Sequence, residues 1–173
     1  MIRADRAGIA SEYAETGREF SRLLVALSSA DLDARSEGTR WTNRQLLFHL
    51  LFGYLVVLRL LVIVRFVGRM PRPFRRAFAA ALNVCTRPFD AVNYWGSCWG
   101  ARIMGTQRMG REWQRVTAAL LARLATEPEA ELGLWMPFPT RWDPFFTDHM
   151  TLEDVYRYPT QHFWFHRRQL SRT

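Results

Sequence analysis

Two histidines near the C-terminal end of the chain, His162 and His166, have the spacing of a metal-binding pair. Residues four apart lie one turn from each other on the same face of a helix. The segment His162-Phe-Trp-Phe-His166 therefore presents two imidazoles on one side. Two such imidazoles can hold one metal ion, and a third ligand would complete an open site of the catalytic type. The chain has four histidines, which keeps the search for that ligand short.

His49 is the candidate for the third ligand. It lies on a predicted helix whose positions 49, 52, 53, 56 and 60 share one face, while Arg65 and Arg69 fall on the opposite side. His49 should therefore point inward with the apolar stripe. A lone inward histidine is more often a satisfied core residue than a ligand. The pair on the last helix favours the metal site, provided that the two helices are neighbours.

The segments that carry these residues resemble the DinB-like superfamily, which is related to mycothiol-dependent maleylpyruvate isomerases and bacillithiol transferases. Trp41-Thr-Asn-Arg-Gln-Leu-Leu-Phe-His49 is similar to that family's tryptophan-then-helix segment ending in a histidine. The stretch from Met150-Thr-Leu-Glu-Asp-Val155 to His166-Arg-Arg-Gln-Leu170 is similar to its closing HxxxH helix. The helix order agrees over most of the chain, whereas the specific motifs cover these two short segments.

The resemblance implies a divalent metal ion, zinc or nickel, held by His49, His162 and His166. It also implies a metal-dependent enzyme: a transferase or isomerase that uses a low-molecular-weight thiol, or a hydrolase. The fold expected is all-α, a four-helix bundle of the DinB type with a short extra helix between helices two and three. Residues 1–173 would form a single domain. Pro159 in the last helix and the basic apolar stretch from Arg59 to Arg87 depart from the family's pattern.

A three-histidine site leaves coordination positions open, either for a water whose pKa falls toward about 7 or for a thiolate. The sequence does not identify a general acid or base. Asp143, Asp148 and Glu153 lie near the last helix, but helix capping explains Asp148 and Glu153 equally well. His149 is a candidate fourth or supporting ligand, although a histidine at the end of a loop is the simpler interpretation.

Apolar periodicity and capping patterns predict the helices that must position these residues. Thr42 and Gln45 fit a capping box at the start of the second helix. Thr151 is the expected N-cap of the last helix, which has acids in its first turn. Pro159 should kink the last helix or split it in two. Predicted helices cover about 7–29, 42–67, 74–84, 89–125 with a glycine-interrupted opening up to 105, and 151–170, and the proline-rich segment 134–146 is a loop.

The second predicted helix and the basic segment after it support a different class of function. The helix is apolar enough to suggest a membrane span, but Arg59 in its middle costs about 2.5–3.5 kcal/mol on insertion, which favours a buried central helix. Arg72, Arg75 and Arg76 then accompany an amphipathic segment. The alternative is thus a non-catalytic protein that contacts an anionic membrane or a partner through residues 59–87.

Composition limits the remaining choices. All 24 basic residues are arginine, and the net charge of +8 suits an anionic small molecule or a membrane surface. Nucleic acid is not expected as a partner, because no known binding signature is present. Cys85 and Cys98 form no CxxC pair, and the polar first residues show no signal peptide, so a cytoplasmic protein, possibly membrane-associated, is expected. A homodimer is possible.

Overall fold

The computed structural model describes residues 4–171 and contains eight α-helices and one two-stranded sheet within that range. The elements are α1 (Arg6–Ala26), α2 (Ser29–Asp33), α3 (Asn43–Gly68), α4 (Arg72–Val84), α5 (Thr86–Ile103), α6 (Thr106–Thr126), α7 (Glu129–Leu132), β1 (Trp135–Met136), β2 (Met150–Thr151) and α8 (Leu152–Arg167).

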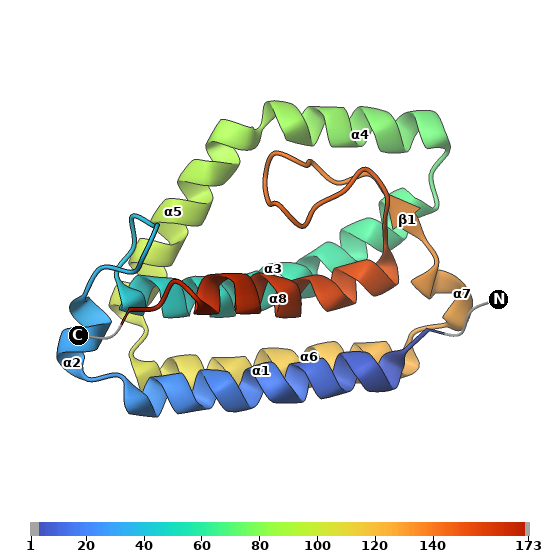
Figure 1. Cartoon of the computed structure of the whole chain (residues 1–173). Helices are drawn as coiled ribbons and strands as arrows, with labels where there is room; N and C mark the ends of the chain where they lie inside the picture. The colour runs from blue at the N-terminus through green and yellow to red at the C-terminus, as the bar shows by residue number, and fades with distance from the viewer. Residues whose placement is uncertain (1–3, 172–173) are drawn as a thin grey trace.

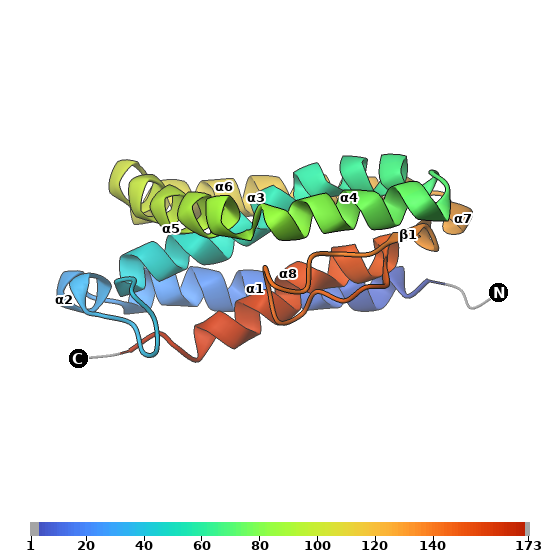
Figure 2. The same ribbon diagram turned by 90° about the horizontal axis from the view of Figure 1, so that it is seen from above.

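Four long helices form a bundle of two layers, with α1 beside α6 and α3 beside α8 (Figures 1 and 2). Their apolar stripes meet in the interior, which is the arrangement that buries an amphipathic helix. Trp113 of α6 stacks on Phe20 of α1 with ring centroids 4.1 Å apart. The same indole also packs on Tyr54 of α3 and Phe163 of α8. The prediction of an all-α four-helix bundle is confirmed.

Helix α3 occupies the centre of the molecule. It begins at the predicted capping box, in which the Thr42 hydroxyl accepts from the Gln45 amide and the Gln45 side chain accepts from the Thr42 amide. Among the described helices it alone is long and apolar enough to cross a membrane, but 56% of its apolar window is buried inside the fold. It packs against α5, α6 and α8, as expected for a central helix.

The predicted helix over 89–125 is in fact two helices, α5 and α6. Met104 and Gly105 both have extended backbone angles and turn the chain between them. Gly100 of α5 lies against the Phe48 ring, where an added Cβ would come within 2.0 Å of a ring atom. Helix α5 therefore packs across α3 and, with the short helix α4 predicted at 74–84, forms an arch over one side of the bundle (Figure 1).

The proline-rich segment contains no helix, as predicted, and it lies beneath the arch (Figure 1). Trp142 in this loop stacks on Phe89 of α5 with ring centroids 4.0 Å apart. The loop is closed at its base by the antiparallel pairing of β1 with β2, in which Trp135 lies opposite Thr151. The sequence did not indicate this pairing, because strands of two residues have no detectable alternation.

The sequence predicts that the last helix kinks or splits at Pro159. Helix α8 runs without interruption from Leu152 to Arg167, so the split is wrong. The proline removes one backbone donor, but buried Tyr156 and Phe163 anchor the turns on either side of it in the core. The helix begins at a capping box between Thr151 and Asp154. His162 and His166 therefore stand one turn apart on a single helix.

Candidate metal centre

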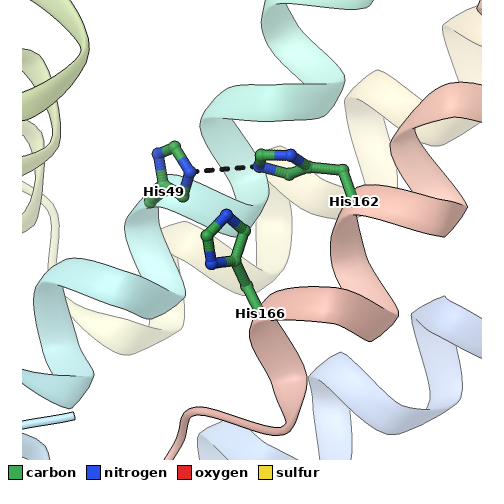
Figure 3. Close-up of side chains that lie close together, drawn as sticks. All are labelled: His49, His162 and His166. Atoms are coloured by element: carbon green, nitrogen blue, oxygen red, sulfur yellow. Dashed lines mark hydrogen bonds between the residues drawn. The ribbon is translucent and has the colours of Figure 1, made fainter. Parts of the chain in front are cut away.

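Three histidines, His49 of α3 with His162 and His166 of α8, meet between the two helices (Figure 3). One ring nitrogen from each lies within 4.8 Å of the others. Nε2 of His49 and Nε2 of His162 are 3.0 Å apart. The neighbouring relation of α3 and α8 that the metal hypothesis required is therefore present, and these three residues form a metal-sized cluster.

Packing holds the His49 ring in place. Its side chain is 3% exposed, and the ring of Trp41, just before the helix cap, stacks on it with centroids 4.4 Å apart. Gly53, one turn further along α3, leaves room for the second histidine, because a Cβ at this position would lie 3.3 Å from Cδ2 of His162. A residue larger than glycine would press on that ring.

The outward nitrogens of His49 and His162 are both bound to other groups. Nδ1 of His162 lies 3.0 Å from the carboxylate of Asp143, which accepts but does not donate. Nδ1 of His49 lies 3.3 Å from the hydroxyl of Ser97, which donates its own proton to the carbonyl of Asn93. Both imidazoles therefore carry their proton on Nδ1 and a lone pair on Nε2.

The same arrangement extends to His166, whose Nδ1 lies 2.6 Å from Oε1 of Gln169. All three Nε2 lone pairs are thus left within the cluster. The two Nε2 atoms of His49 and His162, joined by the dashed line in Figure 3, lie 3.0 Å apart, and with both protons on Nδ1 this contact has no donor. A cation coordinated by these nitrogens would relieve the repulsion between their lone pairs, and hydrogen bonds on Nδ1 are the usual support of histidine ligands. The donor set fits a divalent transition metal ion.

The surroundings of His49 and His166 favour the neutral imidazole, which is the form that binds metal. Burial first, and then the proximity of His162 and His166, lowers the pKa of His49 well below its usual value. Burial and His162 likewise lower the pKa of His166 to about 4. Burial opposes ionisation of Asp143, but hydrogen bonds from His162, Tyr158 and the Phe145 amide outweigh it and lower its pKa.

A cavity of about 200 Å³ adjoins the cluster, and His49 and His162 form part of its wall. Its remaining wall comes from the arch, the proline-rich loop and the face of α3 that continues beyond His49. The hydroxyl of Tyr158 donates to Asp143 at 2.8 Å beside it. The histidine cluster thus opens directly onto this cavity.

The other predicted candidates lie elsewhere. His149 is exposed and stacks on Trp135 with centroids 4.4 Å apart, so it is outside the cluster. Glu153 contacts Arg157, and Asp148 is exposed. Cys98 is half-buried beside a separate surface pocket, and Cys85 is exposed. Of the three acidic candidates, the structure brings only Asp143 to the histidines.

Sequence reasoning missed three supporting residues. Tyr158 precedes His162 by four residues on α8, and this spacing, which places both on one face, is a signal present in the sequence. Gln169 follows His166 by three residues and offers the same kind of signal. Ser97 gives none, because it reaches His49 from another helix.

A family model described as the DinB superfamily matches residues 12–170. The chain therefore belongs to the DinB superfamily. The matched range contains all three histidines and both capped helices that carry them. Searches of curated proteins and of solved structures gave no significant match.

Proposed function

We propose that this DinB superfamily protein binds one divalent metal ion, zinc or nickel, through Nε2 of His49, His162 and His166 and serves as a metal-dependent enzyme. The reaction classes that suit such a site are S-transfer or isomerisation with a low-molecular-weight thiol, and hydrolysis. The convergence of three unprotonated Nε2 atoms, each imidazole being held through Nδ1, carries the proposal. When bound, the metal supplies Lewis-acid chemistry that acidifies a thiol or a water.

The residues around the histidines have separate tasks in this proposal. Asp143 fixes the tautomer of His162 and, as a carboxylate, strengthens it as a ligand. Tyr158 donates to Asp143 and holds that carboxylate toward the imidazole. Ser97 and Gln169 orient the other two rings. Three protein ligands leave open coordination positions for a substrate that enters from the cavity.

Elemental analysis of the full chain, purified without chelator or histidine tag, tests the metal site. We expect about one divalent metal ion per chain. Replacing both His49→Ala and His166→Ala should remove it, because a single imidazole cannot retain the ion. His149→Ala is the matched control, since it deletes an exposed histidine and should leave the metal content unchanged. Full metal occupancy in the double variant would contradict the proposal.

A second candidate function, peripheral contact with an anionic membrane, is favoured by the outer surface of α3, α4 and α5. Nine of the eleven large hydrophobic residues that are exposed among the described residues lie on these helices: Val62, Ile63, Phe66, Phe74, Val84, Val92, Trp95, Trp99 and Ile103. Asp90 is the only acidic residue of the three helices. Arginine beside exposed tryptophan and aliphatic residues is typical of a membrane-contacting surface.

Vesicle binding tests this second function, and the structure selects the variants. Arg75 is half-buried and donates to the Trp135 carbonyl, so it serves the fold. Arg72 and Arg76 are exposed. Changing both to Gln should weaken salt-sensitive binding to phosphatidylserine vesicles, whereas Arg18→Gln with Arg111→Gln, the same loss of charge on the bundle, should not. Absence of binding by the natural chain at low salt would exclude the membrane function.

A further inference from the structure

The cavity beside the histidines is elongated along α3. Its lining residues on this helix follow one stripe from His49 to Val64, which is about four turns or roughly 20 Å. Its volume is about 200 Å³. A dry apolar cavity of about 150 Å³ is enough to bind benzene. This space can therefore hold a substantial apolar group, and its shape suits a chain.

The polar lining residues are gathered near the histidine cluster. His49 and His162 belong to it, Asp143 and Tyr158 are hydrogen-bonded beside it, and Asn93 lies one turn before Ser97, the partner of His49. The rest of the wall is formed by apolar side chains, among them Val56, Leu60, Val64 and Phe78, and by Trp142, whose buried indole Nε1 has no hydrogen-bond partner in the described structure. The two ends of the cavity therefore suit chemically different parts of one molecule.

The charged residues around the cavity limit the charge that a ligand can carry. The chain has 24 basic residues, all arginine, yet none of them lines the cavity. Its one acidic residue, Asp143, is bound to His162 and Tyr158. An anionic group along the apolar wall would lose its hydration and gain no counter-charge, which is strongly unfavourable. The net charge of the chain suits an anionic small molecule. The absence of a basic residue in the cavity lining limits such a substrate to one charged group, which would lie at the histidine end.

We infer that the cavity binds the aliphatic or aromatic tail of an amphiphilic substrate whose small polar head lies at the histidine cluster. The binding of the tail follows from the lining alone, whereas the reaction of the head rests on the proposed metal-dependent function. A substrate with a second charge part-way along its tail is excluded, because that charge would lie against Val56, Leu60 and Val64.

Calorimetric titration of the full chain with n-alkanols from butanol to octanol tests the tail site, because these probes do not depend on strong metal coordination. Affinity should rise about fourfold with each added CH₂ until the cavity is filled. The same series should be seen in zinc-loaded and chelator-treated protein. If the affinity for the n-alkanols does not rise with chain length from butanol to octanol, the inference is overturned.

A substitution that fills the cavity provides the matched test. Val56 lines the cavity, whereas Val62 on the same helix is 54% exposed and does not. Val56→Phe should weaken octanol binding at least tenfold, and Val62→Phe should leave it unchanged. Equal octanol affinity in the two variants would place the binding elsewhere and contradict the inference. If Val56→Phe does not fold, Phe78→Leu on α4 enlarges the cavity and should shift the optimal alkanol by one or two CH₂ groups.

Octanoate and octanedioate test whether the apolar wall rejects a second charge, because they have the same chain length and differ by one carboxylate. Zinc-loaded protein should bind octanoate at least a hundredfold more tightly, and equal affinities would contradict the inference. The two proposals fail separately. Stoichiometric zinc without alkanol binding rejects the tail site alone, and alkanol binding without zinc rejects the metal-dependent function alone.

Discussion

The bundle and the arch use arginine in opposite ways. In the bundle, arginines join helices: Arg157 of α8 pairs with Glu12 of α1, and Arg65 of α3 pairs with buried Glu127. In the arch, none of the ion pairs found among residues 4–171 involves an arginine of α4 or α5. Basic side chains thus stabilise the fold in the bundle, whereas in the arch all of them except Arg75, which contacts Trp135, are exposed and available to an anionic surface.

The two regions also differ in their share of the core. The central apolar core draws on α1, α3, α6 and α8, whereas α5 contributes only Ala101 and α4 contributes none. The histidines stand on core helices, but the arch closes the cavity beside them. The bundle thus supplies the three histidines, whereas the arch and the loop supply two of their supports, Ser97 and Asp143, and the part of the cavity wall that faces α3.

The largest difference between the bundle and the arch should be seen in the free energy of unfolding when one tryptophan of each region is replaced by alanine. Trp113 is 2% exposed at the centre of the bundle, and Trp99 of α5 is 63% exposed. Trp113→Ala should cost about 3–5 kcal/mol of unfolding free energy, since it leaves a cavity among four helices. Trp99→Ala should change it by about 0.5 kcal/mol or less. Urea unfolding measures both, and similar losses would show that α5 belongs to the cooperative core.

Two acidic residues of the proline-rich loop and its continuation to β2, Asp143 and Asp148, should differ in their effect on zinc affinity. Asp143→Asn removes the charge that supports His162 and should weaken zinc binding about 10- to 100-fold. Asp148→Asn, at an exposed position, should leave it unchanged. Competition with a chromogenic chelator measures the two affinities. If Asp143→Asn binds zinc as tightly as the natural chain, Asp143 does not support the site.

Acid titration should reveal the bundle's ion pairs. Hydrogen bonds from Arg22 and, against the effect of burial, from Arg167 of α8 lower the pKa of Glu19 to about 2. Because the unfolded value is near 4.5, this stabilisation is present above that pH and is lost as the pH falls toward 2. We expect a loss of about 1 kcal/mol after solvent screening.

The matched variants for this titration are both on α1. Glu19→Gln should flatten the dependence of unfolding free energy on pH between 4.5 and 2, whereas Glu15→Gln, at an exposed position, should retain it. Thermal unfolding at several pH values distinguishes them. An unchanged slope in Glu19→Gln would mean that Arg167 does not link α8 to α1 through this carboxylate.

The smallest effects should come from two helix glycines. A Cβ on Gly96 of α5 meets nothing within 4 Å, so Gly96→Ala should stabilise the chain by about 0.5–1 kcal/mol. Gly53→Ala gains the same helix propensity but presses on the ring of His162. It should therefore lower zinc affinity by a few-fold, which Gly96→Ala should not. Equal zinc affinity in both would show that the His162 ring can move aside.

The sequence by itself determined the features that depend on neighbours within one or two turns. The capping pairs Thr42 with Gln45 and Thr151 with Asp154 fixed the starts of the two histidine-bearing helices. Helical periodicity turned His49 inward and placed His162 beside His166, because side-chain direction repeats every 3.6 residues. The two segments that carry the histidines also resemble the DinB superfamily, and the match over residues 12–170 confirms this family.

Only the tertiary structure decided how the three imidazoles are held and what lies beside them. Asp143 reaches His162 from a loop, and Ser97 reaches His49 from a helix that the sequence had joined to α6. The apolar cavity likewise forms where α3, the arch and the loop come together. Such contacts join residues far apart in the chain, and their positions depend on how whole elements pack. No local pattern encodes that packing, so the sequence could name the three histidines but not the groups that hold them or the cavity beside them.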